Sequence, residues 1–412
     1  MAQVRTKKRG LSYSYFFEIA KIDGKRKRIE RGGFKSESEA YSAGVKAYEE
    51  YSSSGNVFTL TELSVADFLD VWYERAKLKA RNNTQANYEK MIRVHIKPAL
   101  GTYRLKSVTP AVIDSWVIDK IHDGYARSTV DSMLKVFKKA MDYAVYPGEY
   151  IKENPARYIT VPKDGRNPTD TVRIPITLDE LNKILGRFPF GNPYHMPIIL
   201  GYFTGCRIGE VMGMTWEDVD FDNKTLTIHQ QLQRIIGNGG KWYLCSVKTD
   251  SSNRTITIGE KLIAILKKWK TQQVANEMKY GSFYFLNYAI NDVDTNGREI
   301  KAIVEQAKGT QTSPGVVAHF VCTQENGKNV KQTSFAYVNS VIRNELGIKN
   351  FNFHTLRHTN ATTLIENGAP LKDVTSRLGH SSIEITMDTY THNTSKMKNE
   401  SATILDRITK IN

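Results

Sequence analysis

The chain has 412 residues, of which 40% are hydrophobic and 25% charged. This mixture is typical of a globular protein with two or three domains, and it excludes a collagen-like or wholly disordered chain. Lysine and arginine number 58 against 43 acidic residues, which leaves a formal net charge of +15. Such a surplus favours a polyanionic partner, most simply nucleic acid. A membrane partner is not expected, because no apolar stretch approaches the ~20 residues that a transmembrane helix needs.

Three cysteines, Cys206, Cys245 and Cys322, are too few and too scattered for a disulfide framework or a zinc site. The first ten residues carry no apolar segment of the kind found in secretory signals. We therefore expect a reduced, cytoplasmic protein. Neither HExxH, nor CxxC, nor a GxxxxGK[ST] loop occurs, so we expect no metal and no nucleotide cofactor.

Residues 5–35 hold eleven basic and three acidic residues. Strands are predicted at 12–19 and 25–34, joined by a turn at Asp23-Gly24, with a helix from Ser36 or Ser38 to about Tyr51. One strand face carries three aromatic residues, Tyr13, Tyr15 and Phe17. The return strand begins with four consecutive basic residues, Lys25, Arg26, Lys27 and Arg28. We predict that this basic, aromatic sheet contacts DNA; a solvated hairpin with charged edges is the alternative.

After a flexible joint at 52–56, apolar residues at helical spacing predict four helices. They begin near Ser64, Thr84, Thr109 and Ser128 or Thr129. Ser64 and Asp67 have capping-box spacing, and Pro110 stands at the first position of the third helix. Residues 60–155 are thus predicted to form an all-α domain. A basic, proline-spaced linker follows at 156–176, and we expect it to track a phosphate backbone through Arg157, Lys163 and Arg166.

A third domain, 177–412, begins with a capping box at Thr177 and Glu180. Helices are predicted to Met214, strands at 225–231, 241–248 and 254–258, and mostly helix thereafter. The turn-rich stretch between the strands and residue 350 is interpreted as partly an insertion. The expected fold is a multidomain α+β chain: a small sheet with one helix, an all-α domain, and a mainly α domain with a small antiparallel sheet.

Reactive side chains concentrate in residues 205–390, in five motifs. In chain order they are TGCRIGE, VKTDSSNRTI, HTLRHT, LGHSS and MDTYTH. This series resembles the catalytic domain of the tyrosine recombinase family, the lambda-type integrases. The resemblance covers residues 177–400 through motifs and residues 1–165 through architecture. It implies that 1–55 is an arm-type DNA-binding domain and 60–155 a core-binding, SAM-like domain.

A phosphodiester under attack gathers negative charge on its non-bridging oxygens, which fixed donors stabilise. The planar forks of Arg207 and Arg357 suit two such oxygens. His354 lies one helical turn before Arg357, so both can face one phosphate. The resemblance implies that these three residues and His380 clamp the scissile phosphate. A core histidine at position 354 and an internal ion pair of Arg207 with Glu210 are the alternatives.

Tyr390 lies ten residues after His380, and no other tyrosine follows His380. The resemblance makes Tyr390 the nucleophile, and nearby cations would favour its phenolate. Lys248 is then the general acid that protonates the leaving 5′-oxygen, and Lys241 and Arg254 are the alternatives for this role. Glu210 is expected to support the site. His358 and Cys206 are interpreted as structural.

The resemblance implies a site-specific recombinase of a prophage or integrative conjugative element, located in the cytoplasm with the nucleoid. It implies a 3′-phosphotyrosyl intermediate and a Holliday junction, without metal or ATP. The implied partners are double-stranded DNA with core-type and arm-type sites, three further copies in a tetramer, an excisionase and a DNA-bending protein. The C-terminal segment, with Ile404, Leu405 and Ile408 at helical spacing, would dock on a neighbouring copy or on its own domain.

Three alternatives stay open. One is a recombinase that resolves chromosome dimers, which the separate basic N-terminal domain argues against. The second is a type IB topoisomerase. The third is a non-catalytic DNA-binding relative, which the intact set of candidate residues argues against.

Overall fold

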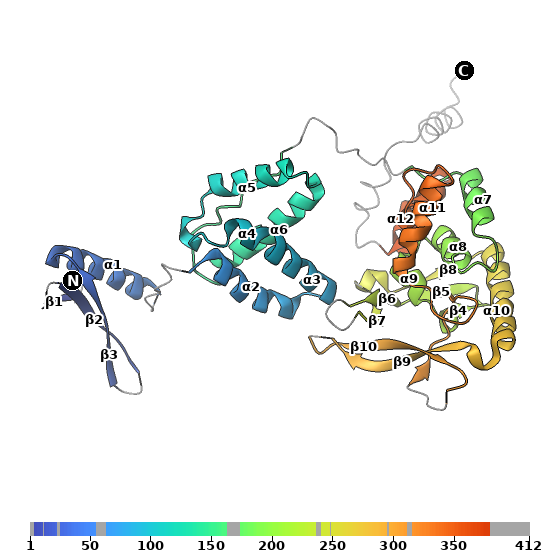
Figure 1. Ribbon diagram of the computed structural model, residues 1–412, viewed down its shortest axis with the longest axis horizontal. Coiled ribbons are helices and arrows are strands. Elements are labelled where there is room, and N and C mark those ends of the chain that lie inside the picture. Colours follow the sequence, from blue (N-terminus) through green and yellow to red (C-terminus); the bar gives the residue numbers. More distant parts are fainter. Residues whose placement is uncertain are drawn as a thin grey trace, which may run out of the picture. The chain divides into compact units, whose positions relative to one another are not determined.

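The computed structural model describes residues 4–10, 12–22, 25–54, 63–162, 174–235, 240–247, 249–294, 296–310 and 315–379 (Figure 1). The chain divides into two compact units. One comprises Met1–Trp72 and Met91–Val161, and the other Tyr73–Lys90 and Pro162–Asn412. No helix within the described ranges combines the length and apolarity that crossing a bilayer would need.

The N-terminal element is a three-stranded antiparallel sheet with one helix packed on it. In order across the sheet it consists of β1 (Arg5–Arg9), β2 (Ser12–Ile22) and β3 (Lys25–Phe34), and α1 (Glu37–Ser54) follows. Tyr15 and Phe17 are buried under α1, where the Phe17 ring meets Tyr48 edge-on at 5.3 Å. Gly44 permits the close approach, since a Cβ there would lie 2.5 Å from Val4 Cγ1. Strand β1 was not predicted.

The prediction that the aromatic face of this sheet contacts DNA is wrong for Tyr15 and Phe17, because that face is the core beneath α1. Successive strand residues alternate between faces, so the intervening Phe16 lies on the other side. There Arg28 stacks over the Phe16 ring at 5.4 Å, and Glu30 binds both Arg28 and Arg9. The Asp23-Gly24 turn lies outside the described residues.

The four predicted helices of residues 64–145 are all present. They are α2 (Val65–Lys79), α3 (Asn82–Lys90) continued by a π-helical turn (Met91–Ile96) and α4 (Lys97–Leu100), α5 (Pro110–His122), and α6 (Arg127–Val145). The predicted helix starts are confirmed at Ser64, whose Oγ accepts from the Asp67 amide at 3.0 Å, and at Thr109, whose Oγ1 accepts from Val112. The apolar stripe of α6, including Met133, is buried.

Residues 73–90 belong to the second unit and are bonded to its later segments. Arg81 Nη1 donates to the Val247 carbonyl at 3.2 Å, and Asn296 Nδ2 donates to the Ala80 carbonyl at 2.8 Å. Gln85 is buried and donates to the Lys77 and Ala80 carbonyls. The end of α2 and all of α3 are thereby held by polar contacts rather than by the apolar stripe alone.

Helices and two antiparallel sheets form the second unit. Besides α3, its α-helices are α7 (Leu178–Arg187), α8 (His195–Thr204), α9 (Ile208–Gly213), α10 (Glu260–Tyr280), α11 (Phe335–Asn344), α12 (Phe353–Glu366) and α13 (Leu371–Leu378). One sheet has the order β4 (Val219–Asp220), β5 (Thr225–Ile228), β8 (Arg254–Thr257). The other has the order β11 (Val316–Val317), β9 (Phe285–Val293), β10 (Glu299–Ala307), β7 (Trp242–Ser246), β6 (Gln230–Arg234). The capping box that starts α7 is confirmed. One apolar core joins helices and sheets.

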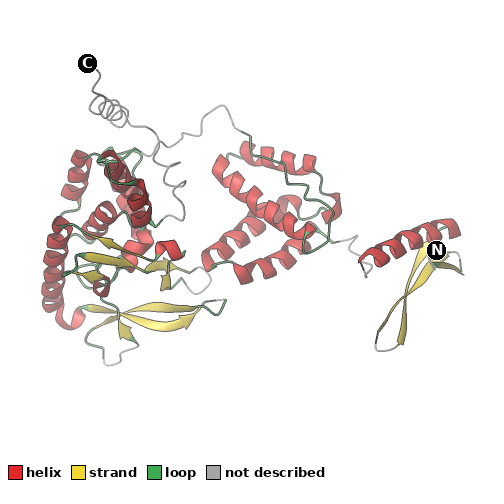
Figure 2. Ribbon diagram, turned by 180° about the vertical axis from the view of Figure 1, so that it is seen from behind, coloured by secondary structure: helices red, strands yellow, loops and turns green. Residues whose placement is uncertain are grey.

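The expected class of fold is confirmed, but the sheets differ from the prediction in three ways. The run 225–231 divides between β5 and β6, which belong to different sheets. Strands β7 and β8, expected in one small sheet, belong to different sheets, and the 3₁₀ turn Asp250–Ser252 precedes β8. Residues 285–307, interpreted as a turn-rich insertion, contain β9 and β10, which pair along nine residues each (Figure 2).

Candidate active site

Arg207 is presented by a sharp turn between α8 and α9. Helix α8 ends at Gly205, whose φ of 67° is left-handed, and a Cβ there would lie 2.7 Å from Leu378 Cδ2. Glycine is therefore required at this position. The turn buries Cys206 completely and leaves the Arg207 side chain 37% exposed at the start of α9. A cation in this position can reach both the protein beneath it and an anion in solvent.

Glu210 lies beneath Arg207 and is nearly inaccessible, with 3% of its side chain exposed. Its Oε1 accepts from Arg207 Nη1 at 2.7 Å. Its Oε2 accepts from the Arg207 amide and from Arg254 Nη2, each at 3.0 Å. The ion pair of Arg207 with Glu210 is thus present, and it fixes the orientation of the Arg207 guanidinium.

The electrostatics of this carboxylate follow from its surroundings. Burial alone raises the pKa of Glu210, but the charges of Arg254 and Arg207 and their hydrogen bonds outweigh it and hold the pKa below its ordinary value. Glu210 therefore stays ionised, and it is one negative charge between two arginines. The neighbouring Cys206 thiol stays neutral, because burial raises its pKa.

Arg357, on α12, is almost fully buried, with 1% exposed. Its Nη1 donates to the Gly205 carbonyl at 2.8 Å, and its Nη2 donates to the Leu378 carbonyl at 2.7 Å. A buried guanidinium is tolerated only with such partners. These two bonds bring α12 to the turn that carries Arg207 and to the end of α13, so the two predicted arginines belong to one cluster.

His354 lies on the first turn of α12, one turn before Arg357, as predicted. Asn352 caps this helix by accepting from the His354 amide at 2.9 Å. The His354 residue is exposed, unlike the buried His358. The alternative of a buried core histidine at position 354 is therefore wrong.

Arg254 is a member of this cluster that the sequence analysis considered only as a rival of Lys248. It is the first residue of β8 and shares the buried face of that strand with Ile256. An arginine at an inward strand position, two residues before a buried isoleucine, is the signal that could have identified it. Burial, together with the charge of Arg254, lowers the pKa of the nearby Arg377. Two arginines, Arg207 and Arg254, thus share the single carboxylate of Glu210, and this excess of positive charge is suited to an anion.

Three predicted residues, Lys248, His380 and Tyr390, lie outside the described residues, as does the C-terminal segment with Ile404, Leu405 and Ile408. Their chain neighbours are described. A Cβ at Gly379 would lie 2.9 Å from the Ser251 carbonyl oxygen, so the residue before position 380 packs against the turn that follows position 248.

Of the predicted DNA-contacting residues, the structure describes the side chains of Arg28 and Arg157. Arg28 is exposed and bound to Glu30, and Arg157 is exposed with its guanidinium over the ring of Tyr158, which is also exposed. The side chains of Lys25, Arg26 and Lys27, and the residues Lys163 and Arg166, lie outside what the structure describes. Within the described ranges, no group of three or more His, Cys, Asp or Glu could hold a metal ion.

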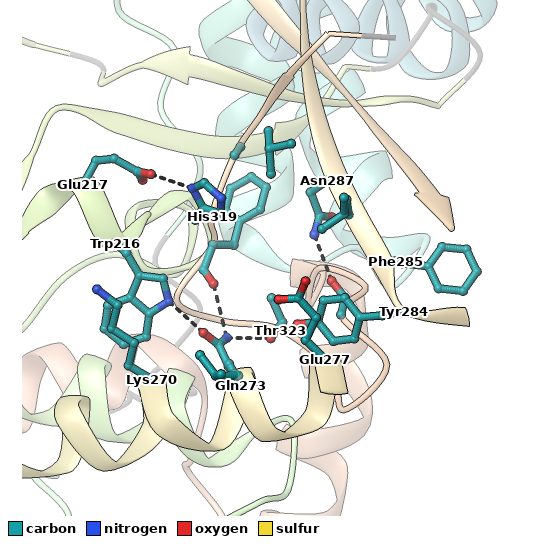
Figure 3. Close-up of a pocket in the computed structure, with 16 residues that line it drawn as sticks. Trp216, Glu217, Lys270, Gln273, Glu277, Tyr284, Phe285, Asn287, His319 and Thr323 are labelled. Atoms are coloured by element: carbon teal, nitrogen blue, oxygen red, sulfur yellow. Dashed lines mark hydrogen bonds and ion pairs between the residues drawn. The ribbon is translucent and has the colours of Figure 1, made fainter. Parts of the chain in front are cut away.

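A cavity of about 460 Å³ lies elsewhere in the second unit, between α10, β9 and the loop at 317–327 (Figure 3). Gln273 spans one wall, accepting from Trp216 Nε1 at 2.7 Å and donating to Thr323 Oγ1 at 2.6 Å. His319 and Glu217 pair at its edge. None of the candidate catalytic residues lines this cavity.

Comparisons with known proteins agree with this arrangement. The model of the phage integrase family matches residues 177–397, more than half of the chain. The N-terminal SAM-like domain of phage integrases matches 64–121, and an arm DNA-binding domain matches 2–44.

Relatives match along most of the chain. A XerC-like tyrosine recombinase of Caldanaerobacter subterraneus subsp. tengcongensis is 28% identical over 84% of this chain and 83% of its own length. The integrase of Staphylococcus phage L54a is 26% identical over 71% of this chain and 77% of its own. The structure of the Tn1549 transposon integrase with transposon right end DNA superposes with a TM-score of 0.64, at 20% identity, over 84% of this chain and 99% of its own.

Proposed function

Since this chain belongs to the phage integrase family and is a tyrosine recombinase, we propose that it integrates and excises a prophage or integrative conjugative element. The observation that carries the proposal is the arginine cluster. Arg207 and Arg357 are 150 residues apart in sequence, yet the carbonyl of Gly205 brings the Arg357 guanidinium to the turn that presents Arg207. Two forks at one place suit one phosphodiester.

The proposed reaction begins with Tyr390. Its hydroxyl loses its proton to solvent, the phenolate oxygen attacks phosphorus, a 3′-phosphotyrosyl bond forms, and the bond to the 5′-oxygen breaks. Lys248 gives that oxygen its proton, while Arg207, His354, Arg357 and His380 stabilise the charge on the non-bridging oxygens. A 5′-hydroxyl of the partner duplex then attacks the phosphotyrosine, which returns the tyrosine and yields a Holliday junction. The energy of the broken bond is kept, so the reaction draws on neither ATP nor a metal.

We propose a separate role for each domain, in the order in which the domains occur along the chain. Residues 1–55 bind arm-type sites, 60–155 bind core-type sites, 156–176 form a basic linker, and 177–412 hold the chemistry. Four copies act on two duplexes beside the nucleoid, with an excisionase and a DNA-bending protein as accessory partners. The match of an arm DNA-binding domain at 2–44 favours a mobile element over resolution of chromosome dimers, because the latter needs no arm-binding module.

The test uses a nicked substrate made from the ends of the element and its flanking genome, in which the nick prevents religation. Wild-type protein in EDTA is expected to give a covalent protein–DNA band on a denaturing gel. Tyr390→Phe is expected to bind the same DNA equally well and to give no band. Equal binding without an adduct from either protein would overturn the proposal in favour of a non-catalytic DNA-binding relative. An adduct followed by supercoil relaxation, without strand exchange between two sites, would favour a topoisomerase.

A further inference from the structure

Arg254 is the most completely bonded side chain around Glu210. Only 6% of the side chain is exposed, and the planar guanidinium makes four contacts with different parts of the protein. Nε donates to the Arg377 carbonyl at 2.6 Å, and Nη1 donates to the Ser252 carbonyl at 2.9 Å. Nη2 donates to Glu210 at 3.0 Å and to Cys206 Sγ at 3.6 Å. Burying a guanidinium is costly, and apolar side chains of similar volume are often as stable or more so. Packing alone therefore does not explain an arginine here.

Each partner of Arg254 adjoins a candidate catalytic residue. Glu210 holds Arg207 through its other carboxylate oxygen. The Ser252 carbonyl belongs to the 3₁₀ turn that begins two residues after position 248. The Arg377 carbonyl lies in the last turn of α13, and the next carbonyl, that of Leu378, accepts from Arg357.

The contact with α13 extends to the residue before position 380. Gly379 has a φ of 67°, and a Cβ there would lie 3.0 Å from Arg254 Nη1. The backbone that leads into position 380 therefore lies directly on the guanidinium. The Gly379 position also lies against Ser251, so Arg254, this turn and the end of α13 are in mutual contact.

We propose that Arg254 is a positioning residue for DNA cleavage. Its guanidinium binds Glu210, which holds Arg207, and it also binds the turn after position 248 and the end of α13 before position 380. We propose that this one guanidinium fixes the distances between these three segments. Its Nε, Nη1 and Nη2 all donate to acceptors of the protein, so it acts through these neighbours. Lysine cannot replace it, because one ammonium cannot reach three acceptors that diverge around a planar fork. This inference rests on the proposed function.

The test compares wild type, Arg254→Lys and Arg254→Gln at saturating protein on the nicked substrate. The matched control is Cys206→Ala, which perturbs the same buried cluster but none of the three oxygen acceptors of Arg254. DNA affinity and the thermal midpoint are measured for each protein, and cleavage is followed at a temperature where each is folded. Two Arg254 variants are included so that unfolding of one leaves the comparison intact.

We expect both Arg254 variants to cleave about 100-fold more slowly than wild type, the effect of a small misplacement of reacting groups, with unchanged DNA affinity. Cys206→Ala is expected to cleave at the wild-type rate. A second substrate carries sulfur in place of the bridging 5′-oxygen, and its thiolate leaves without a proton. Because part of the defect is a misplaced Lys248, this substrate should restore part of the lost rate.

Wild-type cleavage rates in the Arg254 variants would overturn the inference while the proposed function stands. The inference would also be overturned if Cys206→Ala lowered the cleavage rate and the thermal midpoint as much as the Arg254 variants do. The slower cleavage would then come from lost packing alone. Absence of an adduct from wild type would instead overturn the proposed function, and the inference with it.

Discussion

Replacing Glu210 with glutamine tests the charge balance of the arginine cluster most directly. Glutamine keeps the shape of the side chain but removes its charge and turns one acceptor into a donor. The carboxylate now accepts two bonds from Arg207 and one from Arg254. In Glu210→Gln the buried Arg254 would lose its anionic partner, while Arg207 could turn toward solvent.

The magnitude follows from the burial of both partners. Removing one member of a buried ion pair costs about 3–5 kcal/mol, because the other is left buried and uncompensated. The glutamine oxygen still accepts one bond, and Arg207 is 37% exposed. We therefore expect the lower end, about 3 kcal/mol. At about 2–4 °C per kcal/mol for a unit of this size, the melting temperature should fall by about 6–12 °C.

Urea unfolding at pH 7 measures this loss, with Glu217→Gln as the control. Glu217 is also hydrogen-bonded to a basic side chain, His319 at 2.8 Å, but both side chains are 60% exposed. Such a surface pair contributes about 1 kcal/mol or less. A Glu210→Gln loss no larger than that of Glu217→Gln would refute the reasoning.

The same comparison has a pH dependence of defined sign. The pKa of Glu210 is lower in the folded protein than its ordinary value of 4.5. Its contribution is therefore complete above that value and is lost as the pH falls through the lower, folded pKa. The stability gap between wild type and Glu210→Gln should stay constant from pH 7 to about 4.5 and narrow in more acidic solution. A gap that narrows already between pH 7 and 5.5 would contradict the assigned charge state.

Two further predictions concern the turn at Arg207 and the basic surface. Gly205→Ala should cost about 2 kcal/mol in urea unfolding, since it combines a left-handed φ with a Cβ 2.7 Å from Leu378. Gly186→Ala in α7, where a Cβ meets nothing within 4 Å, should instead stabilise by about 0.5 kcal/mol; equal effects would refute the steric argument. Arg157→Ala should reduce the salt dependence of DNA binding by about one unit of log–log slope, and an unchanged slope would remove Arg157 from the DNA contact.

Helices were predictable from the sequence because their signals are local. The capping box at Thr177, the cap at Ser64 and the proline at position 110 each act within the first turn of the helix that they begin. The candidate residue types were predictable for a similar reason, since the motifs around Arg207 and Arg357 are contiguous in sequence. His354 and Arg357 lie about one turn apart on α12, because 3.6 residues complete a turn of an α-helix.

Strand pairing was less predictable, because the partner of a strand lies far along the chain. Residues 285–307 carry many polar side chains and resemble loop until β10 pairs with β7, about sixty residues earlier. The alternation at Tyr15 and Phe17 defines two faces, but only the packing of α1 decides which face is buried. The run 225–231 is continuous in sequence, and only the tertiary structure assigns its halves to two sheets.

The sequence by itself therefore determined which side chains are available for chemistry and the family to which they belong. Only the tertiary structure decided that Arg207 and Arg254 share the carboxylate of Glu210 and that Arg357 binds the turn that presents Arg207. Their convergence depends on carbonyl and carboxylate acceptors contributed by segments 44 to 152 residues apart. Buried charges require such partners, and no local pattern specifies where a distant acceptor will lie.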